Sequence, residues 1–179
     1  MNKEEAAVFK VFDNRHSVRS FSDKSVEKWK LDKILEAIQS APSAGNLQAF
    51  RVIVRSKPEA PGEALYPYGW WAEVAPYQLI FCALRAVSEK KYGSRGKRLY
   101  SIQDATIAAS YAQIAIQALG LGSCWLGAFD EEKVAGILGI DPKLERPIAI
   151  IPFGYPKTGK DEPPKKRRRR EIKDMATFI

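Results

Sequence analysis

The sequence predicts an α+β fold in which a β-sheet packs against long helices. Its expected elements follow the order α, α, β, β, α, β, α, β, which is not the regular βαβ alternation of a parallel sheet. No glycine-rich fingerprint follows an expected strand, which argues against Rossmann and P-loop folds. The 179 residues are 45% hydrophobic and 11% aromatic, enough to build the core of one domain. We therefore expect a single domain over residues 1–179 that ends in a basic tail at 160–179.

Hydrophobic spacing predicts the elements of the first half of the chain. Residues 3–12 and 27–40 carry apolar side chains at the spacing of a helix. The loop APSAGN, with its proline and glycine, ends the second helix. Residues 50–56 alternate in side-chain direction and YQLIFCAL at 77–84 is a continuous apolar run, so each predicts a strand. The polar segment Arg15–Phe21 is expected to be irregular.

Residues 105–129 contain no charged side chain and are long enough to cross a bilayer. Polar residues nevertheless form one stripe along this segment, and Gly120–Ser123 ends the helix after about four turns. The stripe consists of Thr106, Ser110, Gln113 and Gln117. The other faces are rich in alanine, so we expect the central buried helix of a soluble domain or of a subunit interface. The N-terminal residues lack a long apolar run, so we expect no secretory signal and a cytoplasmic location.

The second half begins with a basic segment. Residues 85–98 hold six basic residues, one acidic residue and two glycines, and we expect them to form a mobile excursion. A short strand is expected at 123–127. Asp130 is expected to cap a helix that ends before Gly139, with two glutamates in its first turn. Residues 147–153 predict the last strand, which a linker joins to the tail.

The net charge of +8 is concentrated in two segments, 85–98 and 160–179, while the rest of the chain is close to neutral. A nucleic-acid binder more often spreads basic residues with aromatic ones over one face. Local patches also suit a small ligand that carries a phosphate. The charge alone therefore leaves both a nucleic-acid partner and a small anionic ligand open.

The side chains that usually perform catalysis are scarce. With one histidine, His16, the chain cannot build a catalytic triad or a multi-histidine metal site. Cys82 and Cys124 lie among apolar neighbours without metal-ligand spacing, so we expect two buried thiols in a reducing compartment. Asp104, at the start of the central helix, is expected to be a cap rather than a base. We therefore expect no catalytic side chain and no metal, but a bound cofactor that supplies the chemistry.

The segment RHSVR at 15–19 is a candidate anion site. In an extended conformation Arg15, Ser17 and Arg19 point to the same side. An arginine and a hydroxyl suit a phosphate, and a second cation can meet another electron-rich part of the same ligand. The alternative is a solvated charged turn. The six consecutive cations of Lys165–Arg170 allow a solvated tail, a localisation signal or a nucleic-acid patch.

Several longer motifs occur together in a defined order. NRHSVRSF precedes LDKILEAIQSAPSAGNLQAFRVIV, and GLGSCWLGAFDEEKVAGILGI follows the alanine-rich helix. The strand PIAIIPFGYP and a K-x-R run close the series. Over about residues 8–170 the chain thus resembles the FMN-dependent nitroreductase family, as a short-chain member. The resemblance implies a nitroreductase-like α+β fold with a mixed central sheet, and an intertwined homodimer that binds two FMN molecules at the subunit interface.

The resemblance also implies which residues bind FMN. Arg15 and Ser17, with His16 between them, match positions that hold the phosphate and ribityl chain. Arg19 matches a cation beside the pyrimidine edge, where it stabilises the negative charge that reduction places near N1 and O2. The other implied contacts are Pro42, Ser43, Ala44, Asn46 and Gln48 from the partner subunit, Leu126 and Gly127 near N5 and O4, and Lys165 with Arg167, or Arg169 in another register, on the phosphate.

Two departures from the family pattern bear on the substrate. Gly127-Ala128 stands where longer members place Glu-Gly, so only backbone N–H groups can serve near N5. The segment before YQLIFCAL is shortened to an aromatic loop, Tyr66–Trp71. Its Tyr68, Trp70 and Trp71 either line a substrate slot or pack in the core or at the dimer interface.

The resemblance implies NAD(P)H-dependent reduction of an electron-poor organic acceptor, such as a nitroaromatic or quinone, by ping-pong hydride transfer through FMN. NADH or NADPH is the expected donor, and we expect neither a membrane partner nor a nucleic-acid partner. The alternatives keep FMN for dehalogenation, flavin reduction or binding without turnover, or use the basic tail to bind nucleic acid or another anion. The 85–98 patch either attracts an anionic substrate or a nicotinamide phosphate, or is a solvated loop.

Overall fold

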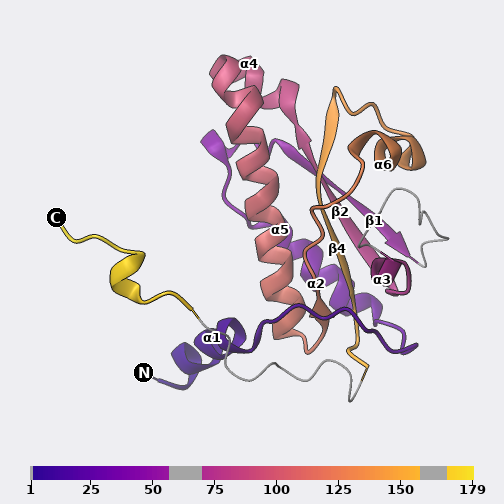
Figure 1. The fold of residues 1–179 in the computed structure, drawn as a ribbon, viewed down its shortest axis with the longest axis vertical. Helices are drawn as coiled ribbons and strands as arrows, with labels where there is room; N and C mark the ends of the chain where they lie inside the picture. The colour runs from indigo at the N-terminus through magenta and orange to yellow at the C-terminus, as the bar shows by residue number, and fades with distance from the viewer. Residues whose placement is uncertain (1, 57–69, 158–168) are drawn as a thin grey trace.

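A four-stranded sheet with the order β1-β2-β4-β3 forms the centre of the fold (Figure 1). The computed structural model describes residues 2–56, 70–157 and 169–179. The strands are β1 (Phe50–Ser56), β2 (Tyr77–Leu84), β3 (Gly122–Ser123) and β4 (Glu145–Gly154). The helices are α1 (Lys3–Asn14), α2 (Lys28–Gln39), α3 (Trp70–Glu73), α4 (Arg85–Arg95), α5 (Ser101–Ala118) and α6 (Glu131–Leu138). Shorter helical turns are η1 (Ala44–Asn46), η2 (Gly96–Tyr100) and η3 (Ile172–Asp174).

The four strands pair antiparallel, with Val52 opposite Phe81 in β1–β2 and Leu79 opposite Ile151 in β2–β4. A mixed sheet was expected from the sequence. Within the described ranges, the parallel pairing is limited to one bridge, between Ser17 and Ser123. The sequence places β1 and β2 at their observed bounds, because alternation and a continuous apolar run are strong local signals.

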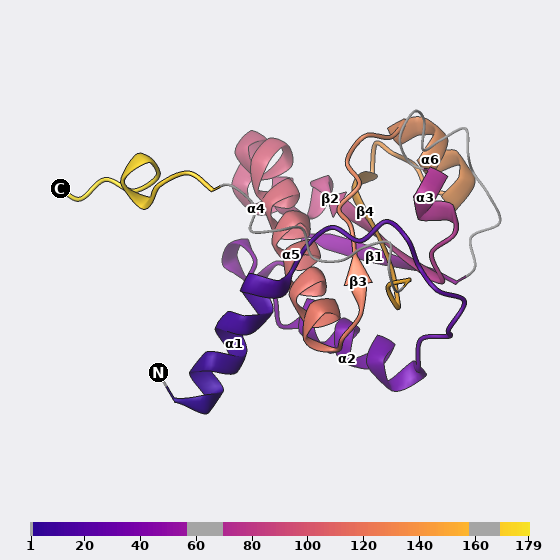
Figure 2. The same ribbon diagram turned by 60° about the horizontal axis from the view of Figure 1, so that its bottom comes forward.

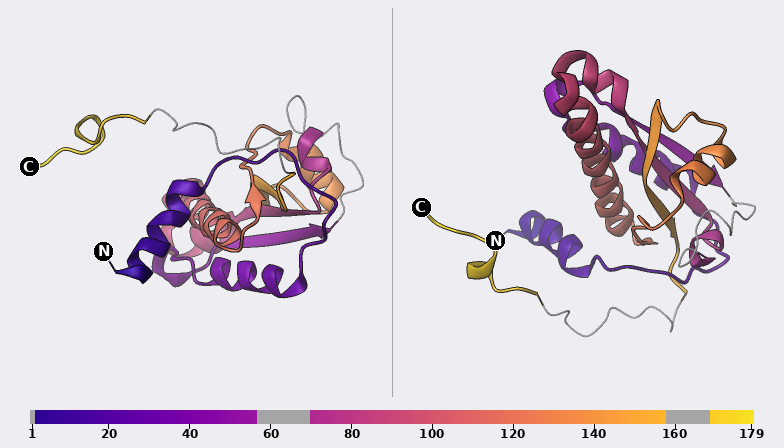
Figure 3. Two further views of the ribbon diagram at one scale, coloured as in Figure 1. Left: turned by 90° about the horizontal axis from the view of Figure 1, so that it is seen from below. Right: turned by 45° about the horizontal axis from the view of Figure 1, so that its top comes forward.

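Both faces of the sheet are covered, as Figure 3 shows for α2 and α5 on one side and α3 and α6 on the other. Leu79 and Phe81 of β2 belong to the core shared with α2 and α5. Ile80 and Cys82 belong to a second core with α6 and the residues after β3. A strand that is buried on both faces needs apolar residues at every position, which explains the run in YQLIFCAL.

The alanine-rich helix α5 packs closely on the sheet. Its fully buried face includes the four alanines Ala105, Ala108, Ala109 and Ala112. The expected buried helix is therefore confirmed, and it begins at Ser101, four residues before the uncharged stretch. Among the described residues, no helix is long and apolar enough to cross a membrane.

The two cysteines are free thiols inside the protein, as expected. Burial raises the pKa of the Cys82 thiol to about 12. A thiol with such a pKa carries almost no thiolate at neutral pH, so Cys82 acts as a small apolar core residue.

Helix ends follow their local capping residues. Asp130 accepts hydrogen bonds from the N–H groups of Glu132 and Lys133, and Gly139 takes the left-handed conformation after α6, as expected. Helix α1 begins with a capping box between Asn2 and Glu5. This helix buries none of its residues in the protomer. Its apolar side chains Val8, Phe9 and Phe12 remain 54–57% exposed.

The expectation of a mobile excursion at 85–98 is wrong. Residues 85–95 form α4, and η2 continues it into α5. Gly93 supplies a positive φ of 58° at a kink, and a Cβ at Gly96 would collide with the Ser88 carbonyl group. The glycines that suggested an irregular segment therefore permit a kinked, tightly packed helix.

Candidate functional site

The segment that contains RHSVR runs as an extended coil past β3, at the edge of the sheet (Figure 2). Ser17 bridges Ser123, and the Val18 N–H donates to the Ser123 carbonyl oxygen at 2.9 Å. Further along, the Ser22 N–H donates to the Tyr155 carbonyl oxygen at 2.8 Å. The segment at 15–21 is irregular, as expected, apart from isolated bridges at Ser17 and Phe21, which pair with β3 and with the residues after β4.

Pairing to β3 fixes which side chains of this segment face outward. Val18 is 1% exposed and lies against Gly122, where a Cβ would collide with it. Since side chains alternate along an extended segment, Ser17 and Arg19 lie on the side opposite Val18. The Arg19 guanidinium lies 5.5 Å from the centroid of the buried Trp71 ring. The Arg19 guanidinium and the Ser17 hydroxyl therefore lie on the same side of the segment. By the same alternation, Arg15 falls on that side two residues before Ser17.

His16 lies between these groups at the start of the extended segment. Its Nδ1 donates to the Asn14 carbonyl oxygen at 2.9 Å, because that oxygen can only accept. The hydrogen bond orients the ring at the point where α1 ends and the extended segment begins.

The two residues implied near N5 and O4 differ in whether their backbone N–H groups are already bonded. Leu126 is buried, and its N–H already donates to the Ile150 carbonyl oxygen at 2.9 Å. Gly127 is exposed, and its N–H makes no backbone hydrogen bond within the described part of the chain. Of the two residues implied near the flavin N5 and O4, Gly127 is therefore the one with an available donor.

The loop at 42–48 has a strained backbone, and hydrogen bonds to Asp104 hold it in place. The buried carboxylate of Asp104 accepts the Ala44 N–H at 2.8 Å and the Ala49 N–H at 3.4 Å. Asn46 and Gln48 both have positive φ values, of 57° and 49°. Positive φ at residues other than glycine costs free energy and persists only where neighbouring contacts enforce it. The expectation that Asp104 caps its own helix is therefore wrong. Its carboxylate fixes loop 42–48 instead.

The other residues of this loop are exposed or half-buried. Pro42 is exposed and Ala44 half-buried, and the Ser43 hydroxyl accepts the Gln48 N–H at 2.9 Å. The loop thus exposes side chains and backbone on one surface.

The structure does not bring the two groups of predicted residues together within one protomer. Loop 42–48 is fixed to Asp104 in the first turn of α5, whereas the 15–19 segment pairs with β3, just after the last turn of α5. The helix between Asp104 and Ala118 spans about 20 Å. Figure 1 shows the two ends of α5 at opposite ends of the molecule.

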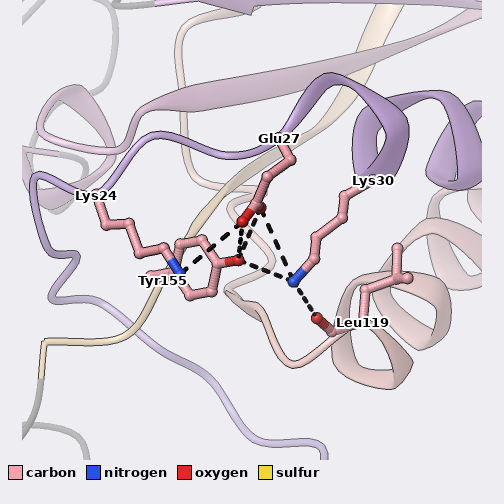
Figure 4. Close-up of polar contacts among 5 residues, drawn as sticks. All are labelled: Lys24, Glu27, Lys30, Leu119 and Tyr155. Atoms are coloured by element: carbon pink, nitrogen blue, oxygen red, sulfur yellow. Dashed lines mark hydrogen bonds and ion pairs between the residues drawn. The ribbon is translucent and has the colours of Figure 1, made fainter.

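A polar network fixes the far end of the extended segment (Figure 4). The Tyr155 hydroxyl donates to the Glu27 carboxylate at 2.7 Å and accepts from Lys30 Nζ at 2.8 Å. Lys30 Nζ also donates to the Leu119 carbonyl oxygen at 2.9 Å, and Lys24 Nζ lies 3.9 Å from the Tyr155 ring centroid. The network joins the start of α2, the end of α5 and the residue that pairs with Ser22. The network therefore positions the extended segment that contains Arg19.

Replacing Tyr155 with phenylalanine tests this network. The Tyr155 hydroxyl lowers the pKa of Glu27 from its ordinary value of 4.5, so the stabilisation is present above pH 4.5 and is lost as pH falls through the lowered pKa. We expect Tyr155→Phe to lower the Tm at pH 7, and the difference from the native protein to narrow below pH 4.5. Thermal unfolding across pH measures this. Tyr111→Phe is the matched control, and an equal Tm loss at pH 3 and pH 7 would contradict the assignment.

Some predicted residues fall outside the described ranges. Lys165, Arg167 and most of the aromatic loop Tyr66–Trp71 lie there. Trp71 is described and lies in the core beside Ile80, which matches the packing interpretation and not the slot. Arg169 is described and exposed. The contact between Asp104 and loop 42–48 was not predicted from the sequence. A single carboxylate next to a long uncharged stretch is a signal that could have indicated it.

A family model and several curated proteins are similar to this chain. The model of the "Nitroreductase family" matches residues 13–72 and 68–155. A Methanothermobacter thermautotrophicus protein assigned as an NADH dehydrogenase/NAD(P)H nitroreductase is 32% identical over 154 residues, covering 83% of this chain and 77% of that protein. An NAD(P)H-type FMN reductase from Bacillus subtilis is 30% identical over 164 residues, covering 83% and 66%. An iodotyrosine deiodinase from Haliscomenobacter hydrossis is 26% identical over 196 residues, covering 94% and 87%.

Solved structures share the fold. A nitroreductase family protein from Streptococcus pneumoniae superimposes with a TM-score of 0.85 at 19% identity, covering 96% of this chain and 99% of that one. An FMN-dependent nitroreductase from Clostridium difficile gives a TM-score of 0.73 at 28% identity, covering 95% and 98%. The α+β fold expected from the sequence is confirmed.

Proposed function

Because this chain belongs to the nitroreductase family, we propose that it is an FMN-dependent oxidoreductase that uses NAD(P)H to reduce an electron-poor organic acceptor. The acceptor is of the nitroaromatic or quinone type. The pairing of Ser17 with Ser123 supports this proposal most strongly, because it places an arginine and a hydroxyl on one side of the extended segment.

The residues present fit FMN. Gly122 gives Val18 room to pack, which leaves Arg15, Ser17 and Arg19 for the outward side of the segment. Arg15 and Ser17 would hold the phosphate and ribityl chain, and Arg19 would stabilise negative charge at the pyrimidine edge. The Gly127 N–H would donate near N5 and O4. When bound, FMN supplies the hydride-accepting and hydride-donating chemistry that the described side chains lack.

A second copy of the chain completes the proposed site. Since loop 42–48 and the 15–19 segment lie at opposite ends of α5, one FMN can contact both only if they come from different protomers. The apolar side chains of α1 support an interface, because Val8, Phe9 and Phe12 remain more than half exposed in the described part of the protomer. The proposed homodimer therefore holds two equivalent sites.

Steady-state kinetics test the reaction. If donor and acceptor use one slot in turn, double-reciprocal plots of NAD(P)H against nitrobenzene or benzoquinone form parallel lines. Intersecting lines would contradict the single slot. The same assay with free FMN as acceptor tests flavin reduction, and halide release from iodotyrosine tests dehalogenation, the activity named for one relative. Binding to DNA that weakens steeply with salt, without bound flavin, would favour the nucleic-acid alternative.

A further inference from the structure

Helix α4 places cationic and aromatic side chains directly on loop 42–48. Gly45 of the loop lies so close to α4 that a Cβ there would collide with the Tyr92 hydroxyl and with Lys91 Nζ. Gly45 also has a positive φ of 56°. The loop and the second half of α4 therefore form one surface.

Arg95 and two tyrosines form the wall of this surface. The Arg95 Nε donates to the Tyr100 hydroxyl at 2.9 Å, and its guanidinium lies 5.4 Å from the Tyr100 ring centroid. The rings of Tyr92 and Tyr100 meet edge to face at 5.2 Å. These contacts hold the guanidinium in place and leave its other N–H groups for a ligand.

An open hollow of about 440 Å³ adjoins this wall. It is lined by Ala44, Tyr100, Gln103, Asp104, Thr106 and Ile107. The Asp104 carboxylate is buried and directed to the loop, where its two oxygens accept the Ala44 and Ala49 N–H groups. The hollow thus combines apolar and aromatic surface with few exposed acceptors.

The charge beside the hollow is positive and largely unneutralised. Glu89 is the single acidic residue in 85–98, and it pairs with Lys97 at 2.9 Å. Within the described ranges, no carboxylate lies within ion-pair distance of Lys91 or Arg95. A fixed guanidinium and a flexible ammonium suit a carboxylate or phosphate group.

We propose that Lys91, Arg95, Tyr92 and Tyr100 form a subsite that selects substrates carrying an anionic group on an aromatic ligand. The inference rests on the proposed function, because loop 42–48 is the loop proposed to line the flavin. The anionic group can come from either of two substrates. It is the 2′-phosphate of the adenosine in NADPH, or a carboxylate on an aromatic acceptor. The anionic group contacts the two cations directly, and this contact lowers KM for the charged substrate.

The test compares charged and neutral substrates in matched pairs with the FMN-loaded protein. The pairs are NADPH against NADH, and 4-nitrobenzoate against nitrobenzene, each measured as kcat/KM. We expect the native protein to prefer the charged member of at least one pair, and the K91Q/R95Q variant to reduce that preference about tenfold or more. The donor pair and the acceptor pair distinguish the two sources. K28Q/K33Q removes the same charge from the exposed side of α2 and serves as the control.

A native protein without charge preference in either pair would overturn the subsite, as would a preference that K91Q/R95Q and K28Q/K33Q change equally. Failure of the proposed function is seen separately, as absence of turnover with NADH and nitrobenzene. In that case calorimetric titration with 4-nitrobenzoate and with NADP⁺ still decides. Binding of either ligand that is lost in K91Q/R95Q and kept in K28Q/K33Q supports the subsite, and binding of neither ligand overturns it.

Discussion

Replacing Arg15 with alanine is expected to weaken FMN binding about 10- to 100-fold. A hydrogen bond between a guanidinium and a phosphate is charge-assisted and contributes about 1.5–3 kcal/mol. The bridge at Ser17 is made by backbone groups, including the Val18 N–H bond to Ser123, which the substitution leaves in place. The variant should therefore fold normally and lose cofactor on dilution, which fluorescence of released FMN measures.

Arg19 provides the contrast to Arg15. Arg19→Ala should retain more FMN than Arg15→Ala, but NAD(P)H should reduce it more slowly, because a fixed cation stabilises charge that develops at the pyrimidine edge. Stopped-flow reduction at saturating donor measures this rate. Full FMN occupancy and unchanged turnover in both variants would show that the 15–19 segment does not bind the cofactor.

Replacing Asp104 with alanine is expected to destabilise the protein by about 2–4 kcal/mol. The carboxylate accepts the N–H groups of Ala44 and Ala49, and each buried donor without an acceptor costs about 1–3 kcal/mol. The Tm should fall by about 5–15 °C for a chain of this size. Because the loop supplies part of the proposed site, FMN binding should weaken as well.

Two controls separate the anchor from a general effect of charge. Asp32→Ala removes an exposed carboxylate that pairs with Lys28, and surface pairs contribute about 0–1 kcal/mol. Asp104→Asn keeps one acceptor oxygen, so its Tm should lie between those of Asp104→Ala and the native protein. A Tm loss for Asp104→Ala no larger than that for Asp32→Ala would exclude the anchoring role.

Local patterns predicted most of the fold. The bounds of β1 and β2 follow from alternation and from burial on both faces, and α6 follows from Asp130 and Gly139. Helix α4 was missed because its glycines and charges have low helix propensity, whereas close packing of Gly96 against Ser88 stabilises it. Packing contacts override helix propensity there, and the sequence pattern alone does not show them.

The candidate site was predicted only in part. The RHSVR pattern indicated which side chains share a face, since the alternation of an extended segment is local. The separation of this segment from loop 42–48 could not be predicted from spacing, because it depends on how α5 crosses the sheet. The Asp104 anchor likewise depends on a contact between residues 60 positions apart.

The visible absorption spectrum of the purified protein, with the released cofactor identified by mass, tests the central claim most directly. We expect a flavin band corresponding to about one FMN per chain, in a particle with the mass of two chains. A colourless protein that also fails to bind added FMN would contradict the assignment of the 15–19 segment and loop 42–48 to a flavin site.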